Sequence, residues 1–284
     1  MNYIETFREM ISLRGLTDHT VTSYSTYIRV YLEYLTTLDI KPEEASWDVM
    51  RDFIVDLQNN RNLADRTINC VISNLRFFTL YVLHKPWDST QLPMRKFDRY
   101  LPFVPSQEEV KTFIFSLPEL REKAMICLLY SSGLRVGEVC RLRYEDISRK
   151  NMTIHITRCK NRSDRYAILS QNALDILTQY WYSYDKPRGW LFPKVYGKDG
   201  PIDTFYVMRH INAHEKRLGW SHRITSHSFR HAFATHLYEN GVDLLTIKTL
   251  LGHKSIYSTT IYITLAKSTL KKVSSPFDSM GGDL

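Results

Sequence analysis

The chain has 284 residues, enough for two domains of ordinary size. Its hydrophobic fraction of 43% and charged fraction of 24% are close to the globular average, which excludes a predominantly disordered chain. The sequence contains neither an apolar run of the roughly 20 residues that a membrane helix needs nor a secretory leader at its N-terminus. Its four cysteines include no close pair, which is typical of neither a zinc site nor a disulfide framework, so we expect a cytoplasmic protein.

The positive charge is concentrated in the C-terminal part of the chain. Residues 1–104 contain 12 Lys and Arg against 13 Asp and Glu, a net charge of −1. Residues 105–284 contain 26 against 17, a net charge of +9. A basic region of this size indicates a protein that neutralises phosphates, although a basic protein with no polyanionic partner remains the alternative.

Residues 1–85 show apolar residues at helical spacing in four successive segments, which predicts a small helical bundle. The expected starts of the second, third and fourth helices are Thr17 or Asp18, the acidic turn Pro42–Glu44, and Asp65. Four prolines then interrupt residues 86–105 and predict a linker. Ser106 and Glu109 have the spacing of a capping box that opens a new helix.

Residues 106–284 form the predicted second domain, mostly helical with a small sheet. Short strands are expected over 153–157 and 166–169, joined by a polar turn at 158–165. Helices are expected over residues 106–117, 121–131, 135–141, 171–182, 203–218, 228–239 and 243–251. The expected fold class is therefore mainly α with a small β-sheet: an N-terminal helical bundle followed by a mixed α+β domain.

Four separated segments contain residues suited to binding or attacking a phosphate. They are Arg135 after a glycine turn, Lys160 in the polar turn, His227 with Arg230 at a spacing of three, and His253 followed by Tyr262. Each is weak evidence by itself, because such residues are common. Their occurrence together, in this order, is stronger evidence than any one of them.

In these segments the sequence resembles the tyrosine recombinases, the family of phage integrases and Xer-type resolvases. The resemblance extends from Ser106 to Leu265 and is closest at His-Ser-Phe-Arg-His-Ala-Phe-Ala-Thr-His, residues 227–236. It implies a site-specific recombinase that cleaves and rejoins DNA through a 3′-phosphotyrosine intermediate. The bundle, residues 1–85, would be the core DNA-binding domain, and residues 106–284 would be the catalytic domain with a C-terminal interaction tail.

The resemblance also implies roles for particular residues. Arg135 and Arg230 would bind the scissile phosphate, with Glu138 as an acidic support. Lys160 would donate a proton to the leaving 5′ oxygen, and His227 would assist proton transfer. His253 would take the second histidine position of the family, and Tyr262 would be the nucleophile. Lys160 departs from the family pattern in its neighbours, since Cys159 and Asn161 flank it where glycine is usual.

Two local alternatives stand beside these assignments. Tyr257 is a rival nucleophile, although the family spacing favours Tyr262. His227 and His231 have the spacing of a helical zinc pair, but Ser228 replaces the glutamate that a metalloprotease motif requires. The implied chemistry uses no metal and no cofactor.

The resemblance further implies double-stranded DNA with inverted-repeat core sites as the partner. It implies a homotetramer on that DNA, either alone or with a second recombinase, in which the tail from Leu265 to Leu284 packs into a neighbour. No arm-binding domain precedes the bundle, which favours a simpler resolvase. The alternatives are a catalytically silent DNA-binding regulator on the same fold and a type IB topoisomerase-like enzyme.

Overall fold

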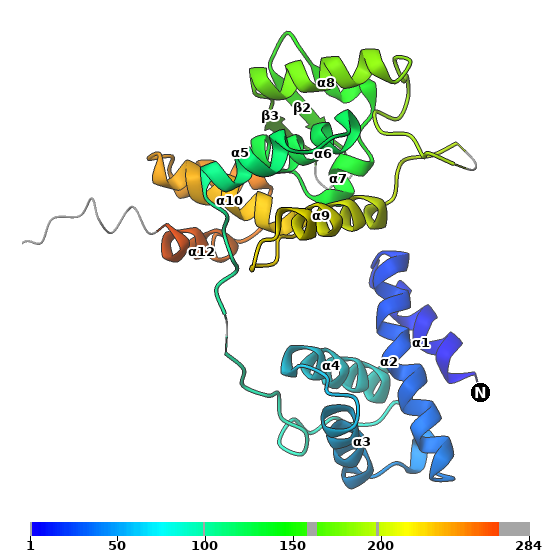
Figure 1. Ribbon diagram of the computed structural model, residues 1–284. Helices are drawn as coiled ribbons and strands as arrows, with labels where there is room; N and C mark the ends of the chain where they lie inside the picture. The colour runs from blue at the N-terminus through cyan, green and yellow to red at the C-terminus, as the bar shows by residue number, and fades with distance from the viewer. Residues whose placement is uncertain (1, 99, 158–163, 197–198, 267–284) are drawn as a thin grey trace, which may run out of the picture. The chain divides into compact units, whose positions relative to one another are not determined.

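The computed structural model describes residues 2–98, 100–157, 164–196 and 199–266. The chain divides into two units, residues 1–100 and residues 101–284, and each is described here by itself. The described residues are mainly helical with one small sheet, which confirms the predicted fold class (Figure 1). Within these residues, none of the helices is both long and apolar enough to cross a membrane.

The first unit contains four helices, as its apolar periodicity predicts. They are α1 (Tyr3–Ser12), α2 (Asp18–Thr37), α3 (Trp47–Asn59) and α4 (Asp65–Tyr81). Thr17 caps α2 by accepting a hydrogen bond from the Thr20 amide. The apolar stripes meet in one core, where the ring of Tyr31 contacts those of Phe53 and Phe78.

One predicted helix start in this unit is wrong, and the start at Asp65 is right although Asp65 does not cap the helix. Pro42–Glu44 forms a separate 3₁₀ turn, and α3 begins later because Ser46 supplies the side-chain cap for the Val49 amide. Asp65 is the first residue of α4 rather than its cap. Its carboxylate pairs instead with Arg95, a residue 30 positions further along the chain.

The segment after α4 packs back onto the bundle. Leu92 is buried in the bundle core, and the Trp87 ring meets Trp47 edge-on with centroids 5.0 Å apart. Arg95 also donates to Gln58 Oε1 at 2.6 Å. The first unit therefore includes residues beyond Lys85, although the described part of residues 86–105 forms no helix or strand.

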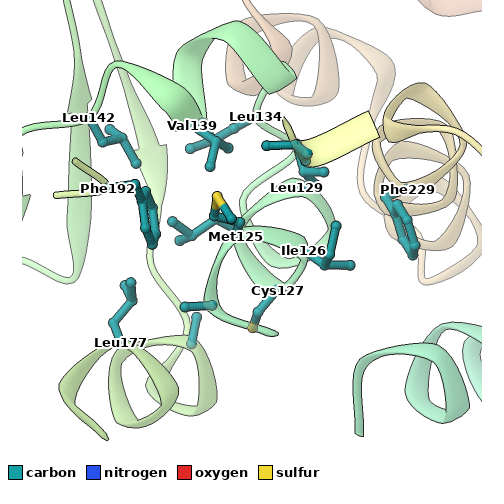
Figure 2. Close-up of a cluster of buried hydrophobic side chains, with 14 of the residues drawn as sticks. Met125, Ile126, Cys127, Leu129, Leu134, Val139, Leu142, Leu177, Phe192 and Phe229 are labelled. Carbon is teal, nitrogen blue, oxygen red and sulfur yellow. The ribbon is translucent and has the colours of Figure 1, made fainter. Parts of the chain in front are cut away.

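The second unit is built around α6, which is buried on nearly every side. Its neighbours are α5, α7, α8, α9 and α10. Figure 2 shows the α6 side chains Met125, Ile126, Cys127 and Leu129 among apolar residues from the surrounding elements. The helices of this unit are α5 (Gln107–Phe115), α6 (Leu120–Ser131), α7 (Val136–Cys140), α8 (Gln171–Ser183), α9 (Thr204–Leu218), α10 (Ser226–Glu239), α11 (Leu244–Leu251) and α12 (Tyr257–Leu265).

A three-stranded antiparallel sheet follows α7 and a 3₁₀ turn at Tyr144–Asp146. Its strands are β1 (Ile147–Ser148), β2 (Thr153–Ile156) and β3 (Arg165–Ile168), in the order β1-β2-β3. Arg165 belongs to β3 rather than to the predicted polar turn, because its backbone is paired with Ile156. Residues 158–163 of that turn lie outside the described residues.

The last three helices pack against one another. α10 contacts both α11 and α12, and α11 contacts α12. Their shared core contains Phe233 and Ala234 from α10, Ile247 and Leu251 from α11, and Tyr262 from α12. This packing buries the predicted nucleophile among apolar residues.

Candidate active site

Helix α10 presents its two predicted site residues differently. Thr225 caps the helix by accepting from the Ser228 amide, which fixes the first turn. His227 in that turn is exposed, whereas Arg230 is only 3% exposed. The Arg230 guanidinium donates to the Gly133 carbonyl and, at 2.6 Å, to the Leu251 carbonyl. Arg230 therefore connects the turn before α7 with the end of α11.

The turn at Gly133 requires glycine. Its φ of +60° lies in the left-handed region, and an added Cβ would stand 2.3 Å from Cδ1 of Phe233. This turn leads into Arg135, which occupies the N-cap position of α7. The Arg135 amide and its Nη1 both donate to the Glu138 carboxylate at 2.8 Å. Arg135 keeps 22% of its side chain exposed, so its guanidinium reaches solvent.

Glu138 is a buried carboxylate between two arginines. Besides Arg135, it accepts two hydrogen bonds from the Arg165 guanidinium, at 3.1 and 2.9 Å. Burial alone raises the pKa of Glu138, but the hydrogen bonds and charges of Arg165 and Arg135 outweigh it and lower that pKa to about 2. The carboxylate is therefore ionised at neutral pH and offsets part of the surrounding positive charge.

His253 follows a glycine that ends α11. Gly252 has a φ of +63°, and its neighbour His253 has Nδ1 hydrogen-bonded to Thr259 Oγ1 at 3.0 Å. Burial first, then the charges of Arg230 and Arg135, lower the pKa of His253 to about 4. The imidazole is therefore neutral at neutral pH, with an orientation set by a hydroxyl of α12.

Tyr262 lies at the centre of these groups and is only 1% exposed. Its ring stacks on that of His253, with centroids 6.4 Å apart and planes within 14°, and lies 5.9 Å from the ring of His231. Burial raises the pKa of Tyr262, while the positive charges of Arg230 and Arg135 act in the opposite direction. Tyr257, at the other end of α12, is 67% exposed.

The structure thus brings most of the predicted site residues together. Arg135, Glu138, Arg230, His253 and Tyr262 form one cluster. His227 joins it through His231, whose ring centroid is 6.3 Å away. Lys160 lies outside the described residues. Among the residues that the structure describes, no three His, Cys, Asp or Glu side chains are grouped to hold a metal ion.

Three further residues belong to this cluster that the sequence did not assign to it. Arg165 contacts Glu138, Thr259 contacts His253, and His231 faces Tyr262. His231 follows Arg230 directly, Thr259 precedes Tyr262 by three residues, and Arg165 follows Lys160 by five. Arg165 and His231 make these contacts with elements more than 20 residues away in the chain, so nearness to a motif residue was the signal in the sequence.

Comparison with known proteins supports one class. Residues 106–269 match the phage integrase family, and residues 3–89 match the phage integrase N-terminal SAM-like domain. A tyrosine recombinase of Pseudothermotoga lettingae is 32% identical, over 89% of this chain and 90% of its own length. Tyrosine recombinase XerD of Chlorobaculum tepidum is 30% identical, over 98% and 96%.

The fold agrees with this class. The crystal structure of the XerH site-specific recombinase, bound to a palindromic difH substrate, matches 91% of this chain and 80% of its own, with a TM-score of 0.74 and 19% identity. The fold and the matched domains together define an enzyme of DNA recombination. The chain belongs to the phage integrase family and is a tyrosine-type site-specific recombinase, which confirms the resemblance found in the sequence.

Proposed function

We propose that this recombinase cleaves DNA by attack of the Tyr262 hydroxyl on the scissile phosphate. The phenolic oxygen forms a bond to phosphorus and the bond to the 5′ oxygen breaks, which leaves a 3′-phosphotyrosine and a free 5′ hydroxyl. Attack by the 5′ hydroxyl of another strand reverses these bonds and rejoins the DNA without an external energy source. The observation that carries this proposal is the position of Tyr262, stacked on His253 and within the field of Arg230 and Arg135.

In this proposal Arg135 and Arg230 bind the non-bridging oxygens of the phosphate. Attack builds negative charge on a five-coordinate phosphorus, and fixed cations stabilise that charge. Arginine suits the task because its planar fork gives parallel donors and remains protonated. Glu138 supports Arg135 from behind, through the two hydrogen bonds described above.

Proton transfer requires a base for the tyrosine and an acid for the leaving oxygen. A free tyrosine has a pKa of about 10, so attack at neutral pH requires that its proton be removed. The family resemblance gives His227 the part of assisting this transfer and Lys160 the part of protonating the 5′ oxygen. His253 is held neutral by its surroundings, and with the Thr259 hydroxyl donating to Nδ1 its Nε2–H would donate a hydrogen bond to the phosphate. The scheme uses side chains alone.

We further propose that the enzyme acts as a homotetramer on two duplexes carrying inverted-repeat core sites, by itself or with a second recombinase. The XerH relative was crystallised on a palindromic substrate, and the family resemblance implies exchange of the tail, residues 265–284, between protomers. The biological task would be integration, excision or resolution of DNA elements. Sedimentation of the protein on paired sites tests the assembly: a complex no larger than a dimer contradicts it.

A suicide-substrate assay tests the reaction. The probe is a nicked duplex carrying the inverted repeats beside the gene, and the readout is a protein–DNA adduct stable in SDS. We expect an adduct on the 3′ phosphate that disappears in Tyr262→Phe and persists in Tyr257→Phe. The Tyr257→Phe variant is a matched control, because the same hydroxyl is removed from the same helix at an exposed position.

Other outcomes would favour other functions. Specific binding without any adduct would indicate a silent DNA-binding regulator. Cleavage and relaxation of DNA that lacks the repeats would indicate a topoisomerase-like enzyme. Loss of the adduct in Tyr257→Phe alone would move the nucleophile to the start of α12.

A further inference from the structure

One guanidinium joins two segments of the site that are distant in the sequence. Arg165, at the start of β3, is only 8% exposed at its side chain. Its Nη1 and Nη2 donate to the two carboxylate oxygens of Glu138 at 3.1 and 2.9 Å. Its Nε donates to the Leu250 carbonyl, in the last turn of α11, at 3.0 Å. All three bonds come from one rigid, planar group.

Each end of this link leads to a proposed phosphate-binding side chain. Glu138 fixes Arg135 by accepting from both its backbone amide and its guanidinium. Leu250 lies three residues before His253. Gly252, between them, packs closely against the aliphatic part of the Arg165 side chain. A Cβ on Gly252 would stand 2.8 Å from Cδ of Arg165 and 3.1 Å from its Nε. Arg165 therefore contacts Glu138, which holds Arg135, and the turn that precedes His253.

We propose that Arg165 is a positioning residue for strand cleavage, setting Arg135 and His253 at a fixed separation across the scissile phosphate. This inference rests on the proposed function. Lysine could not replace arginine here, because an ammonium group lacks the planar fork that bonds both carboxylate oxygens and a carbonyl together. A misplacement of about 1 Å in such a site costs roughly a hundredfold in rate.

The surroundings of Glu138 make this role measurable through pH. Among the described residues, the charged and titratable groups that act on the pair are Arg135 at the start of α7, Arg230 from α10 and His253 after α11. Without Arg165, burial raises the pKa of Glu138 and the remaining arginines oppose it less. A protonated Glu138 no longer accepts both bonds from Arg135, so acid slows the variant more than it slows the native enzyme.

The test measures the single-turnover rate of adduct formation on the nicked suicide duplex, with saturating protein, as a function of pH. Arg165→Gln should react roughly a hundredfold more slowly with unchanged DNA affinity, and its rate relative to the native rate should fall further as the pH is lowered. Arg165→Lys, which keeps the charge but not the fork, should be slow without this additional fall in acid. The double variant with Glu138→Gln should also lack that fall.

Arg149→Gln is the matched control, because Arg149 is an exposed arginine of the same unit that donates to Thr178 Oγ1. It should react at the native rate. An equal loss at every pH in Arg165→Gln, or a native rate in Arg165→Lys, would overturn the proposal.

A second measurement needs no DNA and separates this inference from the proposed function. In nuclear magnetic resonance spectra of the full chain, the side-chain Nε–H signal of Arg135 and the ring signals of His253 should both shift in Arg165→Lys. Neither signal should shift in Arg149→Gln. Unmoved signals overturn the positioning role. Absence of an adduct from the native enzyme, with these shifts present, counts against the proposed function alone.

Discussion

At the scale of single residues, the buried arginine of the site is held by backbone carbonyls. Arg230 bonds the carbonyls of Gly133 and Leu251, so its charge is solvated by fixed dipoles rather than by water. Burial, and then the charge of Arg135, lower the pKa of Arg230 to about 10. The guanidinium therefore remains protonated at neutral pH and needs no reorganisation when a phosphate arrives.

The hydroxyl of Thr259 provides a test at this scale. Thr259→Val keeps the shape of the side chain but removes the hydrogen bond to His253 Nδ1. We expect adduct formation to slow by about tenfold or more, below the factor of about 10²–10⁴ that loss of an entire acid–base group causes. DNA affinity should not change. Thr260→Val removes a neighbouring hydroxyl that bonds to the helix backbone carbonyl of Tyr257, and an equal effect there would contradict the role of Thr259.

At the scale of elements, tight glycine turns bring helices close enough to share side chains. Gly133 lets the turn after α6 pass against Phe233 of α10, and Gly252 lets the end of α11 pass against Arg165 of β3. Both residues have positive φ, a region that other residues adopt only with strain. The carbonyls that hold Arg230 stand at or beside these two turns.

Gly133→Ala tests the importance of that close approach. The added methyl group meets a strained φ of +60° and Cδ1 of Phe233 at 2.3 Å, so something in the packing must shift. We expect a loss of about 2–5 kcal/mol in the free energy of unfolding, the sum of backbone strain and overpacking. Gly219→Ala has a similar φ of +65° but nothing within 4 Å, and should cost only the strain, about 1–2 kcal/mol. Equal losses in thermal or denaturant unfolding would show that the contact with Phe233 is unimportant.

At the scale of the whole molecule, charge is divided unequally between the two units. Because residues 101–104 contain no charged residue, the net charges of −1 and +9 apply to residues 1–100 and 101–284 as well. The second unit therefore supplies most of the long-range attraction for DNA. The first unit has nearly balanced charges, so it must rely on particular side chains for any contact with the duplex.

The salt dependence of DNA affinity measures this attraction. A protein that contacts about 6–10 phosphates loses roughly 10³–10⁵ in affinity between about 50 and about 200 mM salt, because bound counterions are released. We expect a dependence of this size for the full chain on its own site, measured by fluorescence anisotropy. A duplex of unrelated sequence is the control and should show a similar slope at lower affinity. Affinity that does not change with salt would contradict the inference that the positive charge of the second unit attracts DNA.

Local sequence signals predicted much of the fold. Apolar periodicity predicted the helices of both units except α12 (Tyr257–Leu265), which carries Tyr262. The spacing of Ser106 and Glu109 predicted the capping box that opens α5. These predictions succeeded because period and capping depend on residues within one or two turns. The start of α3 was placed at Pro42–Glu44 although the local cap is Ser46. The capping role expected of Asp65 failed because its carboxylate pairs with the distant Arg95.

The sequence by itself determined the family, the mainly helical fold class and the residue types of the candidate site, because the motifs lie in short continuous segments. The tertiary structure alone decided how those segments meet. The carbonyl partner of Arg230 at Gly133 and the fork of Arg165 on Glu138 join elements far apart in the chain, and the burial of Tyr262 depends on the packing of α12 against α10 and α11. Such contacts depend on the packing of whole helices, which no local period or spacing specifies.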